Sequence, residues 1–162
     1  MTIIATLCYI KDNGRTLMLH RNKKPKDIHK GKWNGLGGKA EAGESPEQCV
    51  MREVREESGL VIQRPALKGI ITFPRFDGAN DWCVFVFTAT DFSGQLIDCP
   101  EGTLAWIEDA KIEELPLWEG DYIFLKWLDQ PRIFSARFSY MDGKLQNHSV
   151  AFYPSVGPCL SS

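Results

Sequence analysis

Short runs of apolar and β-branched residues, separated by turn-forming residues, occupy most of the chain. Runs of this length and composition predict strands rather than helices. The predicted strands cover residues 6–10, 16–20, 67–73, 82–89, 104–107, 134–140 and 149–153. Asp-Asn-Gly at 12–14 and Asp-Gly within 141–144 are signals for tight turns, so the first two and the last two strands are expected to form hairpins.

One segment departs from this pattern and has the local chemistry of a capped helix. Ser45 is a favourable N-cap, Pro46 suits the first helical position, and Gln48 completes a capping box with Ser45. Gly59 is suited to end the helix, because glycine readily adopts the left-handed conformation required there. These signals predict a helix at residues 46–58.

A second helix is predicted at residues 119–128, where apolar side chains recur with helical spacing on one side. Strands mixed with two separated helices favour an α/β fold. The chain has no internal repeat and no linker-like segment, so we expect a single domain over residues 1–154. The small and polar tail at 155–162 is expected to be poorly ordered.

Three glutamates lie on one face of the predicted helix 46–58. Glu53, Glu56 and Glu57 are spaced i, i+3 and i+4, which brings their carboxylates together. Like charges at this spacing destabilise a helix, and a bound divalent cation is one explanation for the cluster. A solvated helix face is the alternative, because glutamate-rich helices are common. Val50 and Val54 form a separate apolar stripe that can be buried.

Composition narrows the classes of protein to be considered. Of the 162 residues, 43% are hydrophobic and 25% are charged, as in an ordinary globular protein with one core. No apolar run approaches the roughly 20 residues of a membrane span, and the N-terminus lacks a basic secretory signal. The five cysteines are scattered, which argues for reduced thiols and against a disulfide scaffold or a zinc site. We therefore expect a cytoplasmic protein without a membrane partner.

Charge is unevenly distributed along the chain. The net charge of −2 gives no reason to expect binding to polymeric nucleic acid. Residues 21–32 carry six basic residues and one acidic residue, whereas residues 41–57 carry six glutamates and two arginines. A cationic loop beside a metal-binding acidic helix would suit a polyphosphate carried on divalent cations. A lysine-rich surface loop is the alternative interpretation.

The acidic helix is also part of a longer motif. The pattern Gly-x5-Glu-x7-Arg-Glu-apolar-x-Glu-Glu-x-Gly-apolar is filled without a departure by Gly38, Glu44, Arg52, Glu53, Val54, Glu56, Glu57, Gly59 and Leu60. This is the pattern of the Nudix box, and the chain resembles a Nudix hydrolase. The resemblance implies a Nudix fold, in which a mixed β-sheet is sandwiched between helices and the catalytic loop and helix lie at one end.

The resemblance also implies a catalytic site that uses Mg²⁺, with Mn²⁺ as an alternative cation. Arg52 and Glu44 match a supporting ion pair that holds the loop against the helix. The general base is left open between Glu53 and another carboxylate near the bound water. For Glu101, a surface glutamate in a loop is the alternative to a metal ligand. The implied metal ligands are Glu53, Glu56, Glu57, Glu101 and the backbone carbonyl of Gly37.

Outside the box, residues 31–39, the loop around Glu101 and residues 117–122 resemble the MutT-type 8-oxo-dGTP diphosphatases. In that family, residues matching Asn34 and Asp121 read the edge of the base, and a tryptophan matching Trp118 stacks on it. The other four tryptophans, at 33, 82, 106 and 127, are expected in the core. The implied substrate-binding residues are Thr6, Asn34, Leu36, Gly37, Gly38, Lys39, Trp118 and Asp121.

Taken with the motif, the resemblance implies an enzyme that acts on nucleoside triphosphates. We expect a monomer that hydrolyses oxidised purine nucleoside triphosphates, 8-oxo-dGTP foremost, to the monophosphate and pyrophosphate. Another Nudix substrate, such as a different nucleoside triphosphate, ADP-ribose or a dinucleoside polyphosphate, is the first alternative. A non-catalytic Nudix module that senses nucleotides is the second, and the intact box argues against it. Ile28 and Asn22 depart from the family pocket and argue against broad acceptance of oxidised adenine nucleotides.

Overall fold

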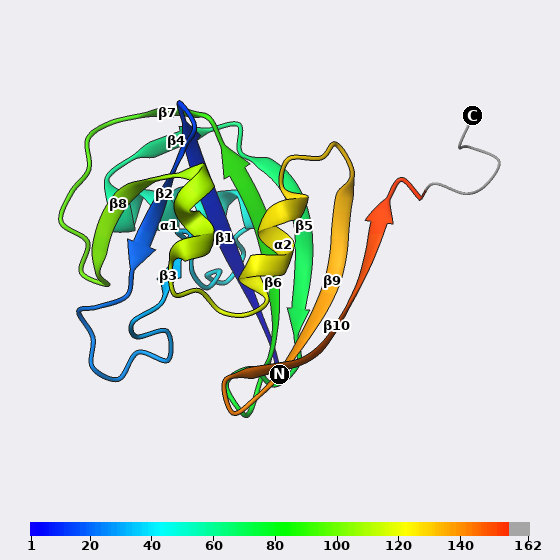
Figure 1. The fold of residues 1–162 in the computed structure, drawn as a ribbon. Helices are drawn as coiled ribbons and strands as arrows, with labels where there is room; N and C mark the ends of the chain where they lie inside the picture. Colours follow the sequence, from blue (N-terminus) through cyan, green and yellow to red (C-terminus); the bar gives the residue numbers. More distant parts are fainter. Residues whose placement is uncertain (156–162) are drawn as a thin grey trace.

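A mixed β-sheet is the centre of the computed structural model, which describes residues 1–155 (Figure 1). Its strands are β1 (Thr2–Asp12), β2 (Arg15–His20), β3 (Trp33–Asn34), β5 (Ala66–Phe73), β6 (Asp81–Ala89), β8 (Thr103–Glu108), β9 (Ile133–Met141) and β10 (Lys144–Tyr153). Within the described residues they run in the order β10-β9-β5-β6-β1-β2-β3, and β8 pairs with β2. Two neighbouring pairs, β1 with β6 and β5 with β9, are parallel, and the other pairs are antiparallel. The sheet is therefore mixed, as predicted.

The remaining elements are short apart from the first helix. Helix α1 spans Pro46–Ser58, and two short strands, β4 (Val61–Gln63) and β7 (Asp91–Ser93), pair with each other beside it. A 3-10 helix, η1 (Asp109–Glu114), follows β8. The chain then forms α2 (Asp121–Phe124) and a further 3-10 turn, η2 (Leu125–Trp127).

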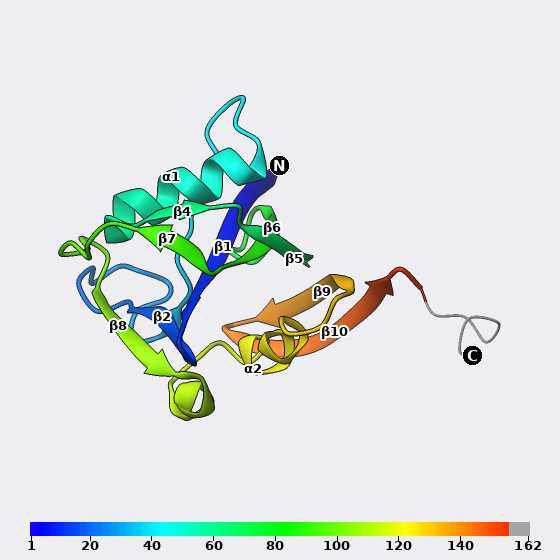
Figure 2. The same ribbon diagram turned by 90° about the horizontal axis from the view of Figure 1, so that it is seen from above.

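Helices cover both faces of the sheet, as seen from above in Figure 2. Alternate residues of β1 point to opposite faces, which is the geometry of any extended strand. On one face, Cys8 and Ile10 pack in a cluster with Val50 and Val54 of α1. On the other face, Tyr9 packs in a cluster with residues of α2. The α/β sandwich and the buried apolar stripe of α1 are thus confirmed.

Helix α1 begins and ends where its sequence predicts. The Ser45 hydroxyl accepts a hydrogen bond from the Gln48 amide at 3.1 Å, and the Gln48 side chain accepts one from the Ser45 amide at 2.9 Å. Gly59 ends the helix with φ of 81°, a value that favours glycine. Both caps depend on neighbours in the sequence alone, which is why the prediction of residues 46–58 is correct.

The second helix is shorter than predicted. A continuous helix over residues 119–128 is wrong, because the helical turn α2 covers only Asp121–Phe124 before it tightens into η2. The amide of Gly120 donates a hydrogen bond at 2.7 Å to the hydroxyl of Tyr140, which lies on β9. This contact fixes the start of the turn from outside the segment, and periodicity alone does not reveal it. Phe124 and Leu128 are nevertheless buried, so the apolar side is predicted correctly.

Several short elements were not predicted. Strands β3, β4 and β7 contain two or three residues each, too few to show a period, and they form by pairing with distant segments. The first strand also starts at Thr2 rather than residue 6. The tail at 155–162 lies outside the described residues except for residue 155, and the single domain over 1–154 stays a prediction. No helix in residues 1–155 is long and apolar enough to cross a membrane.

Candidate active site

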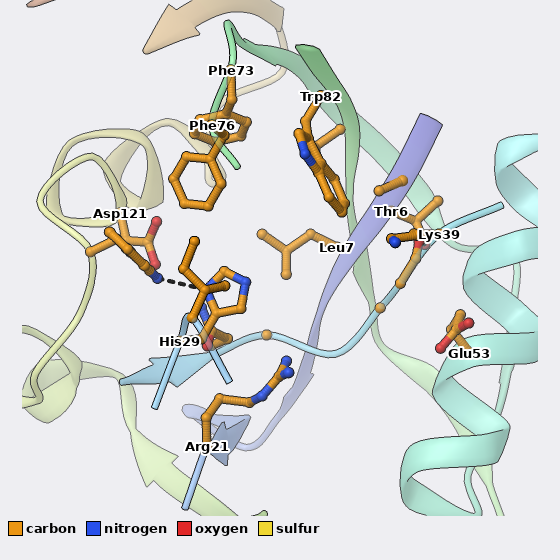
Figure 3. A pocket seen from close by; sticks show the side chains of 18 of the residues that line it. Thr6, Leu7, Arg21, His29, Lys39, Glu53, Phe73, Phe76, Trp82 and Asp121 are labelled. Carbon is orange, nitrogen blue, oxygen red and sulfur yellow. Dashed lines mark hydrogen bonds between the residues drawn. The ribbon is translucent and has the colours of Figure 1, made fainter. Parts of the chain in front are cut away.

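A cavity of about 360 Å³ extends from α1 to α2 across the middle of β1 (Figure 3). Glu53 lies on one side of it, Asp121 and Phe76 lie on the other, and Leu7 and His29 lie between them. Predicted site residues from five separate segments line this one space. They are Thr6, Asn34, Gly37, Gly38, Lys39, Glu53, Glu57, Glu101, Trp118 and Asp121.

The glycine segment brings the backbone close to both β1 and α1. The carbonyl of Gly38 accepts a hydrogen bond from the amide of Thr6 at 2.9 Å, so this segment lies along β1. Gly37 has φ of 154°, and a Cβ placed there would lie 2.0 Å from the backbone oxygen of Thr6. A Cβ on Gly38 would meet the carboxylate of Glu53 at 2.6 Å. Gly37 therefore requires glycine, since a side chain there would displace the loop from β1, whereas a side chain at Gly38 would displace the carboxylate of Glu53.

Glu57 is a buried carboxylate that faces the cavity. It accepts a hydrogen bond from the amide of Gly37 at 2.8 Å and makes no ion pair among the described residues. Burial raises its pKa to about 8, and the neighbouring charge of Glu53 adds to that shift. A carboxylate with so little compensation for its lost hydration is electrostatically suited to bind a cation.

Arg52 connects the loop to the acidic face of α1. Its guanidinium donates to both carboxylate oxygens of Glu44, at 2.6 and 2.9 Å, and to the carbonyl of Lys39 at 3.1 Å. The same side chain reaches Glu53 at 2.8 Å and Glu56 at 3.2 Å. These bonds to Arg52 hold the pKa of Glu44 down at about 2. The predicted supporting pair is thus in contact, and it holds the loop against the helix.

The predicted metal ligands surround one end of the cavity without meeting at one point. No three His, Cys, Asp or Glu side chains within residues 1–155 are arranged to hold a metal ion. Instead, Arg52 pairs with Glu53 and Glu56, while Glu101 pairs with Arg21 at 3.3 Å and with Lys24 at 2.7 Å. Basic side chains therefore act as the counter-ions of these carboxylates. Glu56 is exposed and does not line the cavity.

The donor set nevertheless fits a hard divalent cation. It consists entirely of oxygen atoms, four from glutamates and one from the Gly37 backbone, and such ligands suit Mg²⁺ and Mn²⁺. The buried Glu57 gains most from a cation, because burial already disfavours its ionised form. The ligand roles themselves stay predictions.

The opposite end of the cavity is aromatic. Trp118 lies between Phe76 and Tyr140, with ring centroids 5.1 and 5.5 Å away, and the ammonium group of Lys32 lies 5.3 Å from its ring. The indole N–H of Trp118 donates to Nδ1 of His29 at 2.8 Å. The aromatic rings at this end of the cavity have the chemistry to stack on a planar base.

Two oxygen acceptors face this aromatic end. Asp121 is 8% exposed, and burial raises the pKa of its carboxyl to about 8. The side-chain oxygen of Asn34 is buried and has no hydrogen-bond partner among the described residues. An unpaired buried acceptor costs stability, and a ligand that donates N–H groups would remove that cost.

The remaining predicted substrate-binding residues divide into two groups. Thr6 and Lys39 line the cavity; the hydroxyl of Thr6 lies 3.3 Å from the sulfur of Cys49, and Lys39 lies over the ring of Trp82. The side chain of Leu36 is fully buried in the core beneath α1 and does not line the cavity. Leu36 can therefore act on a substrate only through its backbone.

Several residues of the aromatic end are not among the residues predicted from the sequence. His29, Phe73, Phe76 and Tyr140 line the cavity, and so does Trp82, which was expected in the core. They come from the basic loop, β5, the β5–β6 connection, β6 and β9, and no local pattern marks them as a set. The only sequence signal was their aromatic character within segments that also looked like turns or strands.

Comparison with known proteins identifies the family. Residues 1–128 match the family model of the NUDIX domain. The chain is 38% identical over 120 residues to the uncharacterized Nudix hydrolase YvcI of Bacillus subtilis, covering 72% of each protein. It is 31% identical over 147 residues to the oxidized purine nucleoside triphosphate hydrolase of Danio rerio, covering 91% of this chain and 89% of that protein.

A solved structure supports the same conclusion. The crystal structure of a MutT protein from Bacillus halodurans matches with a TM-score of 0.80 and 35% identity, covering 91% of this chain and 97% of that one. The fold and the motif define a Nudix hydrolase. The chain belongs to the Nudix family, as the complete box predicted.

Proposed function

We propose that this protein hydrolyses oxidised purine nucleoside triphosphates, 8-oxo-dGTP foremost, to the monophosphate and pyrophosphate with the help of Mg²⁺. One observation carries the proposal: an aromatic pocket with two buried oxygen acceptors opens into the same cavity as the carboxylates of α1. A base can therefore occupy one end while its phosphates extend to the other. The oxidized purine nucleoside triphosphate hydrolase among its relatives supports this assignment.

The base end suits a guanine that has been oxidised at C8. Oxidation turns N7 from an acceptor into an N–H donor, which adds to the N–H groups that guanine already presents. Asp121 and Asn34 both offer oxygen atoms to such donors. Stacking against Trp118 contributes about 1–3 kcal/mol whichever purine is bound, so the polar contacts are left to discriminate between bases.

The acidic end suits the polyphosphate. Glu53, Glu56, Glu57, Glu101 and the carbonyl of Gly37 would hold the cation, which when bound neutralises phosphate charge and activates water for attack. Glu53 and Glu57 line the cavity, so either carboxylate can accept the proton of the attacking water. Arg52 keeps the glycine loop in register with α1 through Glu44 and the carbonyl of Lys39.

The proposal includes the setting in which the protein acts. We propose a monomer in the cytoplasm, where the nucleotide pool lies. The cysteines at 8, 49, 83 and 99 are free thiols, which supports a reducing compartment. Gel filtration at several concentrations tests the monomer, since a dimer would elute at twice the mass and shift with dilution.

A hydrolysis panel tests the activity directly. The panel contains normal and oxidised deoxynucleoside triphosphates, ADP-ribose and a dinucleoside polyphosphate, each with Mg²⁺ and with EDTA. We expect 8-oxo-dGTP to be the best substrate and EDTA to abolish turnover. Hydrolysis in H₂¹⁸O should place the label in the monophosphate or the pyrophosphate. Release of inorganic phosphate with a nucleoside diphosphate, or a preference for ADP-ribose, would contradict the proposal.

A further inference from the structure

The proposed function assigns no role to a histidine that lies at the aromatic end of the cavity. His29 lies in the basic loop between β2 and β3, lines the cavity, and stacks on Phe76 with ring centroids 6.0 Å apart and an interplanar angle of 17°. The indole ring of Trp118 meets it edge to face at 5.6 Å. The imidazole is therefore fixed on two sides by aromatic rings.

The hydrogen bond from Trp118 determines which nitrogen of His29 carries the proton. An indole N–H can only donate, so Nδ1 of His29 must accept at 2.8 Å. A neutral imidazole that accepts at Nδ1 carries its hydrogen on Nε2. Protonation of Nδ1 would set two N–H groups against each other and break this bond.

The environment keeps His29 neutral. Burial lowers its pKa to about 4, and the nearby charge of Arg21 lowers it further, while Asp27 opposes the shift. Asp27 is itself held by Arg21 at 2.7 Å, which limits its effect on the imidazole. His29 therefore offers a fixed Nε2–H donor without a positive charge.

The second ring nitrogen of His29 is turned toward the open part of the cavity in Figure 3. No acceptor in residues 1–155 forms a hydrogen bond with this nitrogen, whereas Nδ1 is occupied by Trp118. The side-chain oxygen of Asn34 and the carbonyl oxygen of the Asp121 carboxyl are acceptors for N–H groups of the base. The Nε2–H of His29 is a donor and requires an acceptor.

We infer that His29 is a specificity-determining residue: Nδ1 holds the indole of Trp118 in place, and Nε2–H donates a hydrogen bond to a carbonyl oxygen of the purine base. The inference rests on the proposed function, which supplies the purine substrate. It adds a donor to the two acceptors at the base end. A base that carries both N–H groups and a carbonyl can form hydrogen bonds with Asp121, Asn34 and His29, whereas adenine has no carbonyl group.

Three substitutions separate the two roles of the imidazole. His29→Asn places an oxygen near the position of Nδ1 but removes the Nε2 donor. His29→Gln carries an amide donor near the position of Nε2. His29→Phe keeps a ring and removes both functions. His20→Asn is the matched control, because His20 also stacks on a tryptophan, Trp33, at 4.6 Å and does not line the cavity.

Kinetics on 8-oxo-dGTP, dGTP and dATP give the first readout. For His29→Asn we expect KM for the two guanine nucleotides to rise roughly tenfold, with kcat within about twofold, because one hydrogen bond to the base is lost. The values for dATP should stay unchanged. For His29→Gln, KM for the guanine nucleotides should return part of the way to the wild-type value. His29→Phe should also raise KM for dATP, because Trp118 is no longer held in place. His20→Asn should have the KM and kcat of the wild type. Equal KM values in wild type and His29→Asn would overturn the inference while leaving the proposed activity intact.

Two further measurements keep the inference separate from the activity. Nitrogen-15 NMR of histidine-labelled protein should show His29 as the neutral Nε2–H tautomer at neutral pH. Calorimetry without metal should show 8-oxo-dGMP and dGMP binding more weakly to His29→Asn than to wild type. If wild type hydrolyses no triphosphate, the proposed function fails, and these two measurements still decide the role of His29. The Nδ1–H tautomer, or binding that is equal in wild type and variant or absent in both, would overturn it.

Discussion

The two ends of the cavity are built in different ways. The acidic end comes almost entirely from one continuous stretch, residues 37–57, in which a glycine loop leads into a capped helix. The aromatic end is assembled from the 21–34 segment, β5, β6 and the connection between them, the segment around the start of α2, and β9. One end is therefore fixed by local chemistry and the other by the packing of distant segments. We expect variants at the acidic end to affect turnover of every substrate, and variants at the aromatic end to affect the choice among substrates.

The largest expected effect is at the acidic end. Glu57→Gln or Glu53→Gln should lower kcat for every nucleotide by roughly a thousandfold, equivalent to about 4 kcal/mol of transition-state stabilisation. Each replaces a carboxyl group that lines the cavity by an amide of nearly the same shape. The exposed Glu47 on the same helix provides the control Glu47→Gln, which should turn over normally. Near-normal turnover in the Glu57 and Glu53 variants would remove the basis for the proposed metal site.

The glycine loop joins the two ends and should be the next most sensitive point. Gly37→Ala should reduce the free energy of unfolding by about 3 kcal/mol, because its φ and the contact of its Cβ with β1 are both unfavourable. Gly14→Ala is the control: φ is 75°, but no atom lies within 4 Å of its Cβ, so only about 1 kcal/mol should be lost. Urea unfolding measures both. Equal losses in the two variants would show that the close approach to Thr6 has no energetic consequence.

At the aromatic end, substitutions should separate affinity from discrimination. Asp121→Asn should lower kcat/KM for 8-oxo-dGTP at least roughly tenfold, because an NH2 donor replaces one carboxyl oxygen and an N–H group of the base loses its acceptor. Trp118→Ala should weaken all purine substrates more evenly, since stacking does not distinguish between them. Asp129→Asn, at an exposed aspartate beyond η2, serves as the control. If both variants had wild-type kinetics, the role of Trp118 and Asp121 would be purely structural.

The smallest expected effect is a pH dependence of stability. Burial raises the pKa of Asp121 from 3.8 to about 8, so between these values the folded protein binds a proton that the unfolded chain releases. The stabilisation of the folded protein by Asp121 is therefore fully present below about pH 4 and is lost as the pH rises toward 8. Between pH 4.5 and pH 8, the free energy of unfolding of the wild type should fall by at least about 1.4 kcal/mol more than that of Asp121→Asn. This difference is the equivalent of one pKa unit. Parallel stability curves for the two proteins would show that Asp121 is already ionised in the fold.

The same division explains how far the sequence could predict the structure. Helix α1 and its caps depend on residues within four positions of one another, so the sequence suffices to place both ends. The extent of α2 does not follow the apolar periodicity of residues 119–128, because a hydrogen bond to Tyr140 of β9 fixes the amide of Gly120. Trp82, Phe76 and His29 could not be assigned to the cavity, since only the parallel pairing of β1 with β6 and the course of the basic loop bring them together.

The separation of the two ends also affects how new variants of this protein can be obtained. Residues 28, 29, 76, 82 and 118 line the base end, and none of them belongs to the stretch that carries the acidic motif. A combinatorial library confined to these five positions leaves the hydrolytic motif intact in every member. Selection from such a library can therefore search for enzymes with altered base preference, while each inactive member reports on folding or binding rather than on a damaged reaction centre.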